Sequence, residues 1–299
     1  MRNKQEKGSV LIASLWALSI FSVLMTSLTF EGFQHTFLMK RELKALQLKM
    51  DLRSALGIFT ETLLADPKPH EDSREDSWHG TLDLPETWRR RIEVTVQDEE
   101  SKMNLNFASE DLIKTFLELF EEEAGSLKGE PKAFVKEILK LRSKGRISSF
   151  EELFLLEDIE KEDLEKLHAY LTVYPDLAQM NINTVSPLVL KSLVRSLTDD
   201  HFAAEELTEK VIEYQEKIKI GDQIPFTQDD LTPDLFQKKL ALRKSLPMLS
   251  LMNRFLPFMT ADSRTYHLMI KAQNGTEVQA VAKDRAEGFG VDILSWNET

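Results

Sequence analysis

The chain begins with a long apolar segment behind a short charged head. Ser9 to Phe30 contains no charged residue, no proline and no glycine, whereas residues 1–8 carry three basic side chains and one acid. As a helix, these 22 residues would span about 33 Å, enough to cross the ~30 Å hydrocarbon core of a membrane. Basic flanks of such helices stay in the cytoplasm. The pattern therefore predicts a single membrane span, with the basic head in the cytoplasm and the remaining chain outside.

Three interpretations of this segment compete. A secretory signal peptide would have a shorter apolar run that ends in small residues, whereas Glu31 follows directly here. A plain membrane anchor needs no further feature. The third interpretation uses Gly8, because a short basic head that ends in glycine resembles the leader of type IV pilin-like proteins. That resemblance implies cleavage by prepilin peptidase between Gly8 and Ser9 and methylation of the new Ser9 amine. Most pilins carry glutamate at the fifth mature position, which is Ala13 here.

The helical pattern continues beyond the apolar segment. Apolar residues recur every three or four positions up to Ala65, as an amphipathic helix requires, and the first proline is Pro67. We therefore predict one helix from Ser9 to Ala65, with its second half in water. The apolar stripe of that second half has to bury against another element; it consists of Phe37, Met39, Leu43, Leu46, Met50, Leu56, Phe59 and Leu63.

The next segment, Asp66 to Gly80, is predicted to be a loop. Its carboxylates and imidazoles are residue types that suit metal ions, but the spacing of an EF-hand is absent. We expect a solvated acidic loop and predict no metal site. The charged side chains concerned are Glu71, Asp72, Glu75 and Asp76, together with His70 and His79.

Alternating apolar and polar residues predict β-strands in two distant parts of the chain. One part lies near residue 92, and the other follows residue 264, where Asn274-Gly275 is a strong hairpin signal. A three-stranded meander alone is marginally stable. We therefore predict one antiparallel sheet that combines both parts and covers the helix stripe. The expected strands are Thr81–Leu84, Arg90–Val96, Thr265–Ala272, Glu277–Asp284 and Phe289–Trp296.

Between these strands, from Ser109 to about Ser245, the pattern is helical throughout. Short helices with polar links predict a compact all-helical domain, so the fold class is α+β with a large helical insertion. The apolar stretch Leu246–Met259 is predicted to be a buried connection back to the sheet. Helix signals are Ser109, Pro131 to Lys144, the Ser149 and Glu152 capping box, Asp163 to Val173, Ser186-Pro187, and Glu205 to Ile220.

Composition and the lack of known motifs argue against several classes of function. The chain has 299 residues, no cysteine and a formal net charge of −12, so it is stabilised by burial rather than disulfides and is poorly suited to unspecific nucleic-acid binding. It has no G-x-S-x-G, H-E-x-x-H or phosphate-binding G-x-x-x-x-G-K motif. The carboxylates are mostly on predicted helix faces, such as Glu118 to Glu123. We predict neither an enzyme nor a cofactor.

Two segments resemble the helix-hairpin-helix modules of DNA-uptake proteins. They are Met180 to Ser186 with the apolar helix after it, and Gly145 to Ile159. Such modules hold phosphate on a hairpin that contains glycine, but Leu190 to Glu213 has no glycine and is acidic where phosphate would lie. We expect a similar scaffold that binds no nucleic acid.

Four features together resemble the general secretion pathway protein K family, the large minor pseudopilins of type II secretion. They are the leader with Gly8, a D-E-x-G-K-(I/L)-N-L-N-like segment, an N-x-N-T-A-like segment, and C-terminal strands that end near Trp296. Ser101 replaces the family's glycine, and residues 134–149 are basic where the family often has an acidic calcium-binding segment, so we carry over no calcium site. The matching motif residues, expected to be structural, are Asp98, Glu99, Lys102, Asn104, Asn106, Asn181, Asn183 and Thr184.

The resemblance implies a pilin-like fold, in which a long N-terminal helix packs on an antiparallel sheet and a large all-helical domain is inserted. It divides the chain into a leader (1–8), the N-terminal helix (9–65, with 9–30 transmembrane), the first part of the sheet (66–103), the inserted domain (104–260) and the completing strands (261–299).

The resemblance also implies a function at the bacterial inner membrane, with the body in the periplasm. Such a subunit caps the pseudopilus with other minor pseudopilins, initiates its assembly and supports export through an outer-membrane channel. Ala13 fits this position, because the usual glutamate neutralises the terminal amine of the subunit above, and a tip subunit has none above it. A minor pilin of a type IV pilus or DNA-uptake machine is the alternative, and an enzyme or binding domain on a plain anchor is the third.

Overall fold

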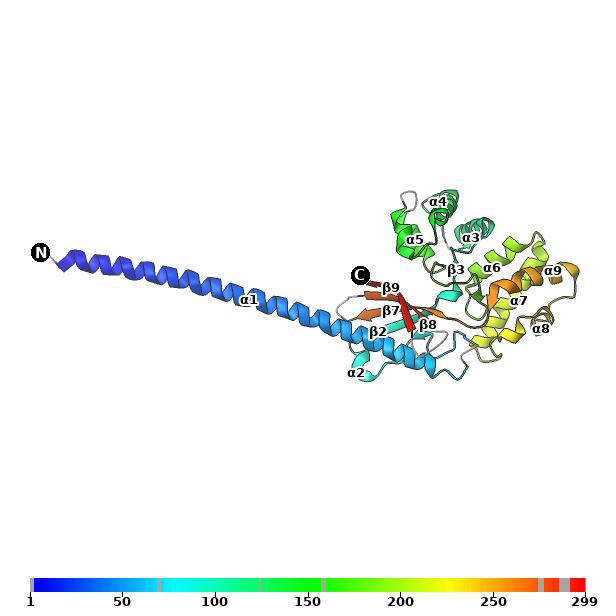
Figure 1. Cartoon of the computed structure of the whole chain (residues 1–299), viewed down its shortest axis with the longest axis horizontal. Coiled ribbons are helices and arrows are strands. Elements are labelled where there is room, and N and C mark those ends of the chain that lie inside the picture. The colour runs from blue at the N-terminus through cyan, green and yellow to red at the C-terminus, as the bar shows by residue number, and fades with distance from the viewer. Residues whose placement is uncertain are drawn as a thin grey trace. The chain divides into compact units, whose positions relative to one another are not determined.

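A computed structural model describes residues 3–68, 71–123, 125–156, 160–273, 277–284 and 291–298. The chain divides into two compact units, Met1–Ser54 and Ala55–Thr299. Helix α1 (Asn3–Leu64) contributes to both and is drawn in blue in Figure 1. The predicted long N-terminal helix is confirmed, and it ends one residue before the predicted position.

From Val10 to Met50, the apolar side chains of α1 are mostly exposed. Its most apolar window of 18 residues has no buried side chain, and the helix is long and apolar enough to cross a membrane. Such a helix fits a single-pass membrane anchor. Phe37, Leu43 and Met50 are also exposed, so the predicted burial of the apolar stripe is wrong for this part of the helix.

The second unit contains a five-stranded antiparallel sheet in the order β1-β2-β7-β8-β9. Strand β2 pairs with β7 over its whole length, from Ile92 opposite Ala272 to Asp98 opposite Tyr266, and Figure 1 shows these distant segments side by side. The predicted union of the two β regions is therefore confirmed. The strands are β1 (Gly80–Thr81), β2 (Ile92–Asp98), β7 (Thr265–Ala272), β8 (Glu277–Asp284) and β9 (Val291–Glu298). The Asn274-Gly275 turn lies outside the described residues.

The last turns of α1 pack against this sheet. Phe59 is fully buried, and its ring lies edge-on to Tyr266 of β7, with 5.3 Å between the ring centroids. Trp78, from the loop after α1, contacts the same tyrosine at 4.9 Å. A buried aromatic cluster of this kind contributes ~0.5–1.5 kcal/mol per ring pair beyond its area burial. It anchors the end of α1 and the following loop to one face of the sheet.

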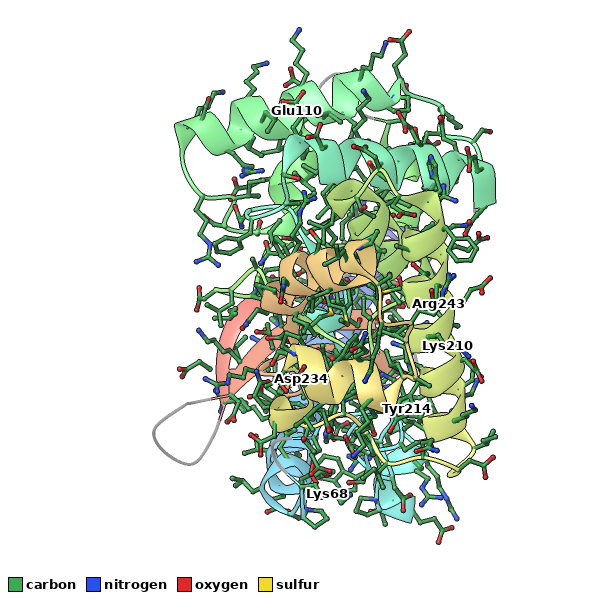
Figure 2. All side chains as sticks on the ribbon, turned by 90° about the vertical axis from the view of Figure 1, so that its right-hand side faces the viewer. Lys68, Glu110, Lys210, Tyr214, Asp234 and Arg243 are labelled. Carbon is green, nitrogen blue, oxygen red and sulfur yellow. The ribbon has the colours of Figure 1, made fainter. Side chains whose placement is uncertain are left out.

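Between β2 and β7 the chain forms the helical insertion. Tyr214, labelled in Figure 2, begins a row of aromatic rings that continues through Phe226, Phe236 and Phe255, with centroid distances of 4.5, 5.6 and 6.0 Å. The predicted α+β class with a helical insertion is confirmed. After the short α2 (Glu86–Arg89), the helices are α3 (Glu110–Glu123), α4 (Pro131–Lys144), α5 (Lys161–Leu167), α6 (Pro187–Leu197), α7 (His201–Lys219), α8 (Pro233–Lys239) and α9 (Leu246–Phe255).

Local capping explains several helix boundaries. Ser109 Oγ accepts a hydrogen bond from the Leu112 amide at 3.1 Å, and α4 begins at Pro131 as predicted. The capping box of Ser149 and Glu152 is present, but it starts a 3₁₀-helix, η2 (Phe150–Leu155). Short 3₁₀-helices also occur at η1 (Glu99–Ser101), η3 (Gln228–Asp230) and η4 (Leu256–Phe258).

Two predicted helices have wrong boundaries. The helix predicted to reach Val173 ends at Leu167. Residues Leu171–Thr172 instead form strand β4, which pairs in parallel with β3 (Met103–Asn104). The helix predicted from Glu205 begins at His201 instead, since Asp200 Oδ1 accepts hydrogen bonds from the Phe202 and Ala203 amides.

The interval predicted to be helical throughout also contains one strand of a second two-stranded parallel pair, whose other strand lies beyond that interval. Strand β5 (Met180–Asn181) pairs with β6 (Met259–Thr260). The apolar stretch between Ser245 and β6 forms α9 and η4, with Met252 and Phe255 buried and Leu246 exposed. The predicted burial is therefore correct for one face of this helix only.

Candidate functional site

The two polar motifs of the sequence meet where the sheet joins the helical insertion. The chain leaves the sheet at Asp98, the end of β2, and returns to it just after Ser263. We call this region the polar junction. Its side chains are buried apart from that of Asn106, which is half-buried; they are Asp72, Asp98, Glu99, Glu100, Lys102, Asn104, Asn106, Asn181, Asn183, Thr184 and Ser263.

Asp98 lies at the centre of the junction and is fully buried. Its Oδ2 accepts hydrogen bonds from Ser263 Oγ at 2.6 Å, from Asn181 Nδ2 at 3.3 Å and from Thr184 Oγ1. Its Oδ1 accepts one from the Glu100 amide at 2.8 Å. A single carboxylate thus joins the end of β2, the turn after β5 and the segment before β7.

Asn181 and Asn183 connect this centre to the surrounding backbone. Asn181 Nδ2 donates to the Asp72 carbonyl at 3.0 Å and to Ser263 Oγ at 2.7 Å, while its Oδ1 accepts from the Asn183 amide at 2.9 Å. Asn183 pairs with both backbone groups of Phe226, at 3.0 and 2.8 Å. Only an amide side chain both donates and accepts in this way, which explains asparagine at both positions.

Asn104 and Asn106, the asparagines of the other motif, bind backbone groups of the helical insertion in the same way. Asn104 Nδ2 donates to the Pro175 carbonyl at 2.8 Å. Asn106 Nδ2 donates to the carbonyls of Ile147 and Val173, both at 2.9 Å, and its Oδ1 accepts from the Ile147 amide at 2.9 Å. These bonds fasten two loops of the insertion, around Ile147 and from Val173 to Pro175, to the segment that follows β2.

Glu99 and Lys102 form a buried ion pair. Lys102 Nζ lies 2.5 Å from Glu99 Oε1, and the two side chains are only 2% and 1% exposed. Thr172 Oγ1 donates to the other carboxylate oxygen, and His267 Nδ1 lies 3.7 Å from Oε1. Burial alone would raise the pKa of Glu99, but Lys102 and His267 outweigh it and lower this pKa.

Burial lowers the pKa of two neighbouring histidines. The rings of His168 and His267 lie edge-on, 5.3 Å apart, and His168 also contacts Phe150 at 4.5 Å. Burial, followed by the positive charges of Lys102 and His267, lowers the pKa of His168 to about 4. Burial lowers the pKa of His267 as well, against the opposing effect of the Glu99 carboxylate.

A second group of carboxyls in the junction has no cationic partner. Among the described residues, no lysine, arginine or histidine side chain pairs with Asp72, Asp98 or Glu100. Burial raises the pKa of Asp72 to about 8, although the Ser263 amide donates to its Oδ2 at 2.6 Å. Burial also raises the pKa of Asp98 and that of Glu100.

The acidic loop before β1 differs from its prediction. Asp72 and Ser73 are only 3% and 1% exposed, so the expectation of a fully solvated loop is wrong at these positions. Carboxylate oxygens of Asp66, Asp72 and Asp76 lie within 4.8 Å of one another. Because Asp72 binds the Ser263 amide and Asp76 Oδ2 accepts from the Ser73 amide at 2.5 Å, we interpret the cluster as structural. His70 lies outside the described residues.

The other predicted site residues lie apart from this network in sequence. Gly8, Ser9 and Ala13 all belong to α1 within Met1–Ser54, and the Ala13 side chain is exposed. Peptidase cleavage and methylation at Gly8 and Ser9 stay predictions.

Sequence reasoning missed the residues that complete the junction. Asp72, Thr172 and Ser263 come from three separate segments, none of which carries a recognisable motif. Glu100 lies inside the matched motif at its variable position. Its position two residues after Asp98 was the available signal, because a run of acids at the end of a buried strand needs partners.

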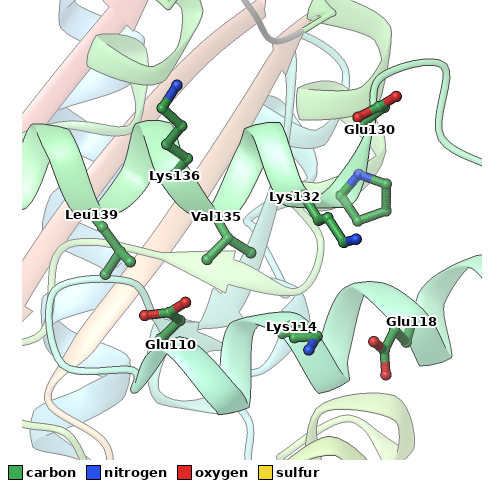
Figure 3. A pocket seen from close by; sticks show the side chains of 9 residues that line it. Glu110, Lys114, Glu118, Glu130, Lys132, Val135, Lys136 and Leu139 are labelled. Carbon is green, nitrogen blue, oxygen red and sulfur yellow. The ribbon is translucent and has the colours of Figure 1, made fainter.

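A surface groove lies between α3 and α4. It has a volume of about 700 Å³, and Figure 3 shows Val135 and Leu139 pointing from α4 toward α3. Charged side chains of both signs line it, among them Glu110, Lys114 and Glu118. None of these groups is buried, so the groove has no feature that indicates acid–base catalysis.

Comparisons with known proteins identify the fold. No family model and no curated protein matches the chain. Among solved structures, a chain from the crystal structure of the GspK-GspI-GspJ complex of the enterotoxigenic Escherichia coli type 2 secretion system aligns with a TM-score of 0.59. The chain has a pilin-like fold. The alignment covers 89% of this chain and 99% of that chain at 11% sequence identity, so the likeness extends over the sheet and the insertion together.

Proposed function

We propose that the chain is a minor pseudopilin at the tip of a type II secretion pseudopilus, where it initiates assembly and supports protein export across the outer membrane. The observation that carries this proposal is the structural likeness to 99% of a chain from the GspK-GspI-GspJ complex. A subunit of this kind is a structural component, not an enzyme, in line with the absence of a catalytic motif from the sequence.

In this proposal the two ends of α1 have different environments. Residues 1–8 are a leader, and Ser9 to Phe30 lies in the inner membrane with its basic end in the cytoplasm. The rest of the chain is periplasmic. The pilin-like sheet comprises residues 66–103 and 261–299, and the inserted domain comprises residues 104–260.

The proposed partners follow from the same likeness. The similar chain belongs to a complex named for three secretion components, so we infer that other minor pseudopilins contact this chain at the tip. Prepilin peptidase would act at Gly8, and the outer-membrane channel would lie beyond the tip. Ala13 supports a position at the tip. Its methyl side chain cannot neutralise the amine of a subunit above, and a tip subunit has none above it.

Leader cleavage gives a direct test. Gly8→Ala should retain residues 1–8 and abolish secretion of exported proteins, whereas wild type should yield a methylated Ser9 terminus by mass spectrometry. Gly32→Ala is a matched control in the same helix, because a Cβ at Gly32 meets no atom within 4 Å. An intact Met1 terminus in wild type, or normal cleavage in Gly8→Ala, would contradict the proposal and favour a plain anchor.

A deletion strain separates secretion from the related machines. Loss of exported proteins from the medium, with twitching and transformation intact, is the expected phenotype. Loss of twitching or of transformation with normal secretion would instead indicate a minor pilin of a type IV pilus or DNA-uptake machine.

A further inference from the structure

The helices α8 and α9 and the turn between them carry positive charge in an acidic protein. Residues 235–261 contain five basic side chains and no acidic one, although the formal net charge of the chain is −12. Two of the five are paired: Lys239 Nζ lies 2.6 Å from Asp230 Oδ2, and Arg243 Nε donates to Glu206 Oε2 at 2.7 Å. The other three are exposed and pair with no acidic side chain in the described part of the chain; they are Lys238, Lys244 and Arg254. These three cations are available to a group outside the molecule.

Apolar side chains are exposed beside these cations. Leu246 is 82% exposed and Leu249 is 41% exposed. They are three positions apart at the beginning of α9, so they lie on one face of the helix, whereas Met248 and Met252 are buried. Pro247 is exposed as well. Covering such side chains with a partner releases the water around them, which favours binding.

The turn before α9 is held in one conformation. Arg243, labelled in Figure 2, places its guanidinium carbon 3.9 Å from the centroid of the Phe202 ring. Its backbone amide donates to Glu206 Oε1 at 3.1 Å, and its carbonyl accepts from Gln237 Nε2 at 3.0 Å. In the same turn Ala241 has a φ of 51°, in the left-handed region that residues other than glycine rarely adopt. Unfavourable backbone of this kind is found at binding sites, where the surrounding contacts maintain it.

The stacked pair adjoins the exposed leucines. Arg243 precedes Leu246 by three positions, and Phe202 is 62% exposed although Arg243 covers one side of its ring. Aromatic and arginine side chains contribute most of the binding energy in many protein interfaces. A surface that is already fixed also loses little conformational entropy when a partner binds. We call the exposed side of residues 235–254, together with Phe202, the α8–α9 surface.

A protein segment fits this surface better than an anionic lipid surface does. Asp199 and Glu205 are exposed three positions on either side of Phe202. A flat anionic bilayer would meet these two acids together with the cations, and the net charge of the whole chain would oppose its approach. A protein segment can place its carboxylates at the cations and avoid the acids.

We propose that the α8–α9 surface binds an acidic segment of a partner protein, which places an apolar side chain against the two leucines and its carboxylates against the three unpaired cations. Phe202 and Arg243 form the rigid edge of this site. The inference goes beyond the proposed secretion role and does not depend on it. It can fail while the leader of residues 1–8 is cleaved as expected, and the reverse also holds.

The test uses a phage-displayed library of random peptides, selected on the full chain in detergent after binders to empty micelles are removed. Enriched peptides should carry aspartate or glutamate on both sides of a leucine or phenylalanine. Their affinity should fall at least about tenfold in the triple variant Lys238→Glu/Lys244→Glu/Arg254→Glu, because the attractive charges become repulsive.

A matched control separates the position of the charges from their number. Lys114→Glu/Lys132→Glu/Lys136→Glu changes the net charge by the same amount at exposed lysines that line the groove between α3 and α4. This control should bind the enriched peptides as wild type does. Equal binding by the two triple variants would overturn the proposal, as would selected peptides without acidic residues or the absence of any enrichment.

The apolar part of the site has its own test, which also covers a triple variant that fails to fold. Leu246→Ser should weaken binding of the enriched peptides about tenfold, because their apolar side chain loses its partner. Leu155→Ser is the matched control, since Leu155 is 81% exposed on η2, and it should have no effect. Equal affinities of these two variants would show that the peptides bind elsewhere.

A fluorescence measurement tests the lipid surface as an alternative partner. The chain has no cysteine, so Leu246→Cys can be labelled at one position with a polarity-sensitive fluorophore. After reconstitution, its emission should be the same in phosphatidylcholine vesicles and in vesicles that also contain phosphatidylglycerol. A blue shift with phosphatidylglycerol would assign the surface to lipid and overturn the proposal.

Discussion

Thr184 Oγ1 donates a hydrogen bond to Asp98 Oδ2 across 86 positions of the chain. Both groups are buried, at 1% and 0% exposure. The bond joins the turn after β5 to the end of β2, and thus the helical insertion to the sheet. Because a buried carboxylate requires all its donors, the residues around Asp98 should be sensitive to substitution far from any surface that contacts a partner.

Asn181→Ala should lower the free energy of unfolding by about 2–4 kcal/mol, because it leaves several buried donors and acceptors without partners. The measurement is urea unfolding of the full chain in detergent. Asn253→Ala is the control, since Asn253 is exposed on α9, and should change stability by less than ~0.5 kcal/mol. Equal effects of the two substitutions would show that the junction does not stabilise the fold.

Lys102→Met should destabilise the protein by about 3–5 kcal/mol, because Glu99 would remain as a buried charge without its cation. The double variant Glu99→Gln/Lys102→Met should be more stable than Lys102→Met alone, since it removes both charges. Chemical unfolding of the four proteins of this cycle gives the coupling energy. Additive effects of the two substitutions would mean that Glu99 and Lys102 do not interact.

His168 should make the protein less stable at acidic pH. Its pKa falls from the ordinary 6.5 to about 4 in the folded chain, so the unfolded chain binds more protons between these values. Stability should therefore decrease as the pH falls from 6.5 toward 4.

His168→Phe should reduce this loss of stability at acidic pH by a few degrees in Tm. A change of ~1 kcal/mol shifts Tm by about 2–4 °C in a domain of this size. Thermal unfolding at pH 4.5 and pH 7 measures the difference between wild type and variant. This difference is informative because Asp72 acts in the opposite direction: its raised pKa makes stability decrease as the pH rises toward 8. If stability decreases between pH 7 and pH 4.5 as much in His168→Phe as in wild type, groups other than His168 cause the decrease.

Asp200→Ala should cost ~0.5–2 kcal/mol of stability, because the Asp200 side chain caps α7 through the amides of Phe202 and Ala203. Asp199→Ala removes the same charge one position earlier, from an exposed side chain, and should have little effect. Circular dichroism during urea unfolding compares the two. If Asp199→Ala were equally damaging, the effect would come from charge and not from capping.

Local sequence signals predicted the elements that depend on neighbouring residues. Uninterrupted apolar and amphipathic spacing predicted α1, and the proline at Pro131 predicted the beginning of α4. Alternation predicted β2 and β7 within two residues of their limits. The prediction failed at Leu171–Thr172, where pairing with Met103–Asn104 overrides the helical pattern. A contact between segments so far apart leaves no periodicity in either segment.

By itself, the sequence determined the order of elements, the helical insertion between two parts of one sheet, and the membrane-compatible helix at the start. It also marked Asp98, Asn181 and Thr184 as noteworthy without indicating that they touch. Only the tertiary structure decided that Asp72, Glu100 and Ser263 join them in a buried site with more carboxyls than cations. The physical reason is that helices and strands arise from periodicity over a few residues, whereas burial and protonation depend on segments that meet only after folding.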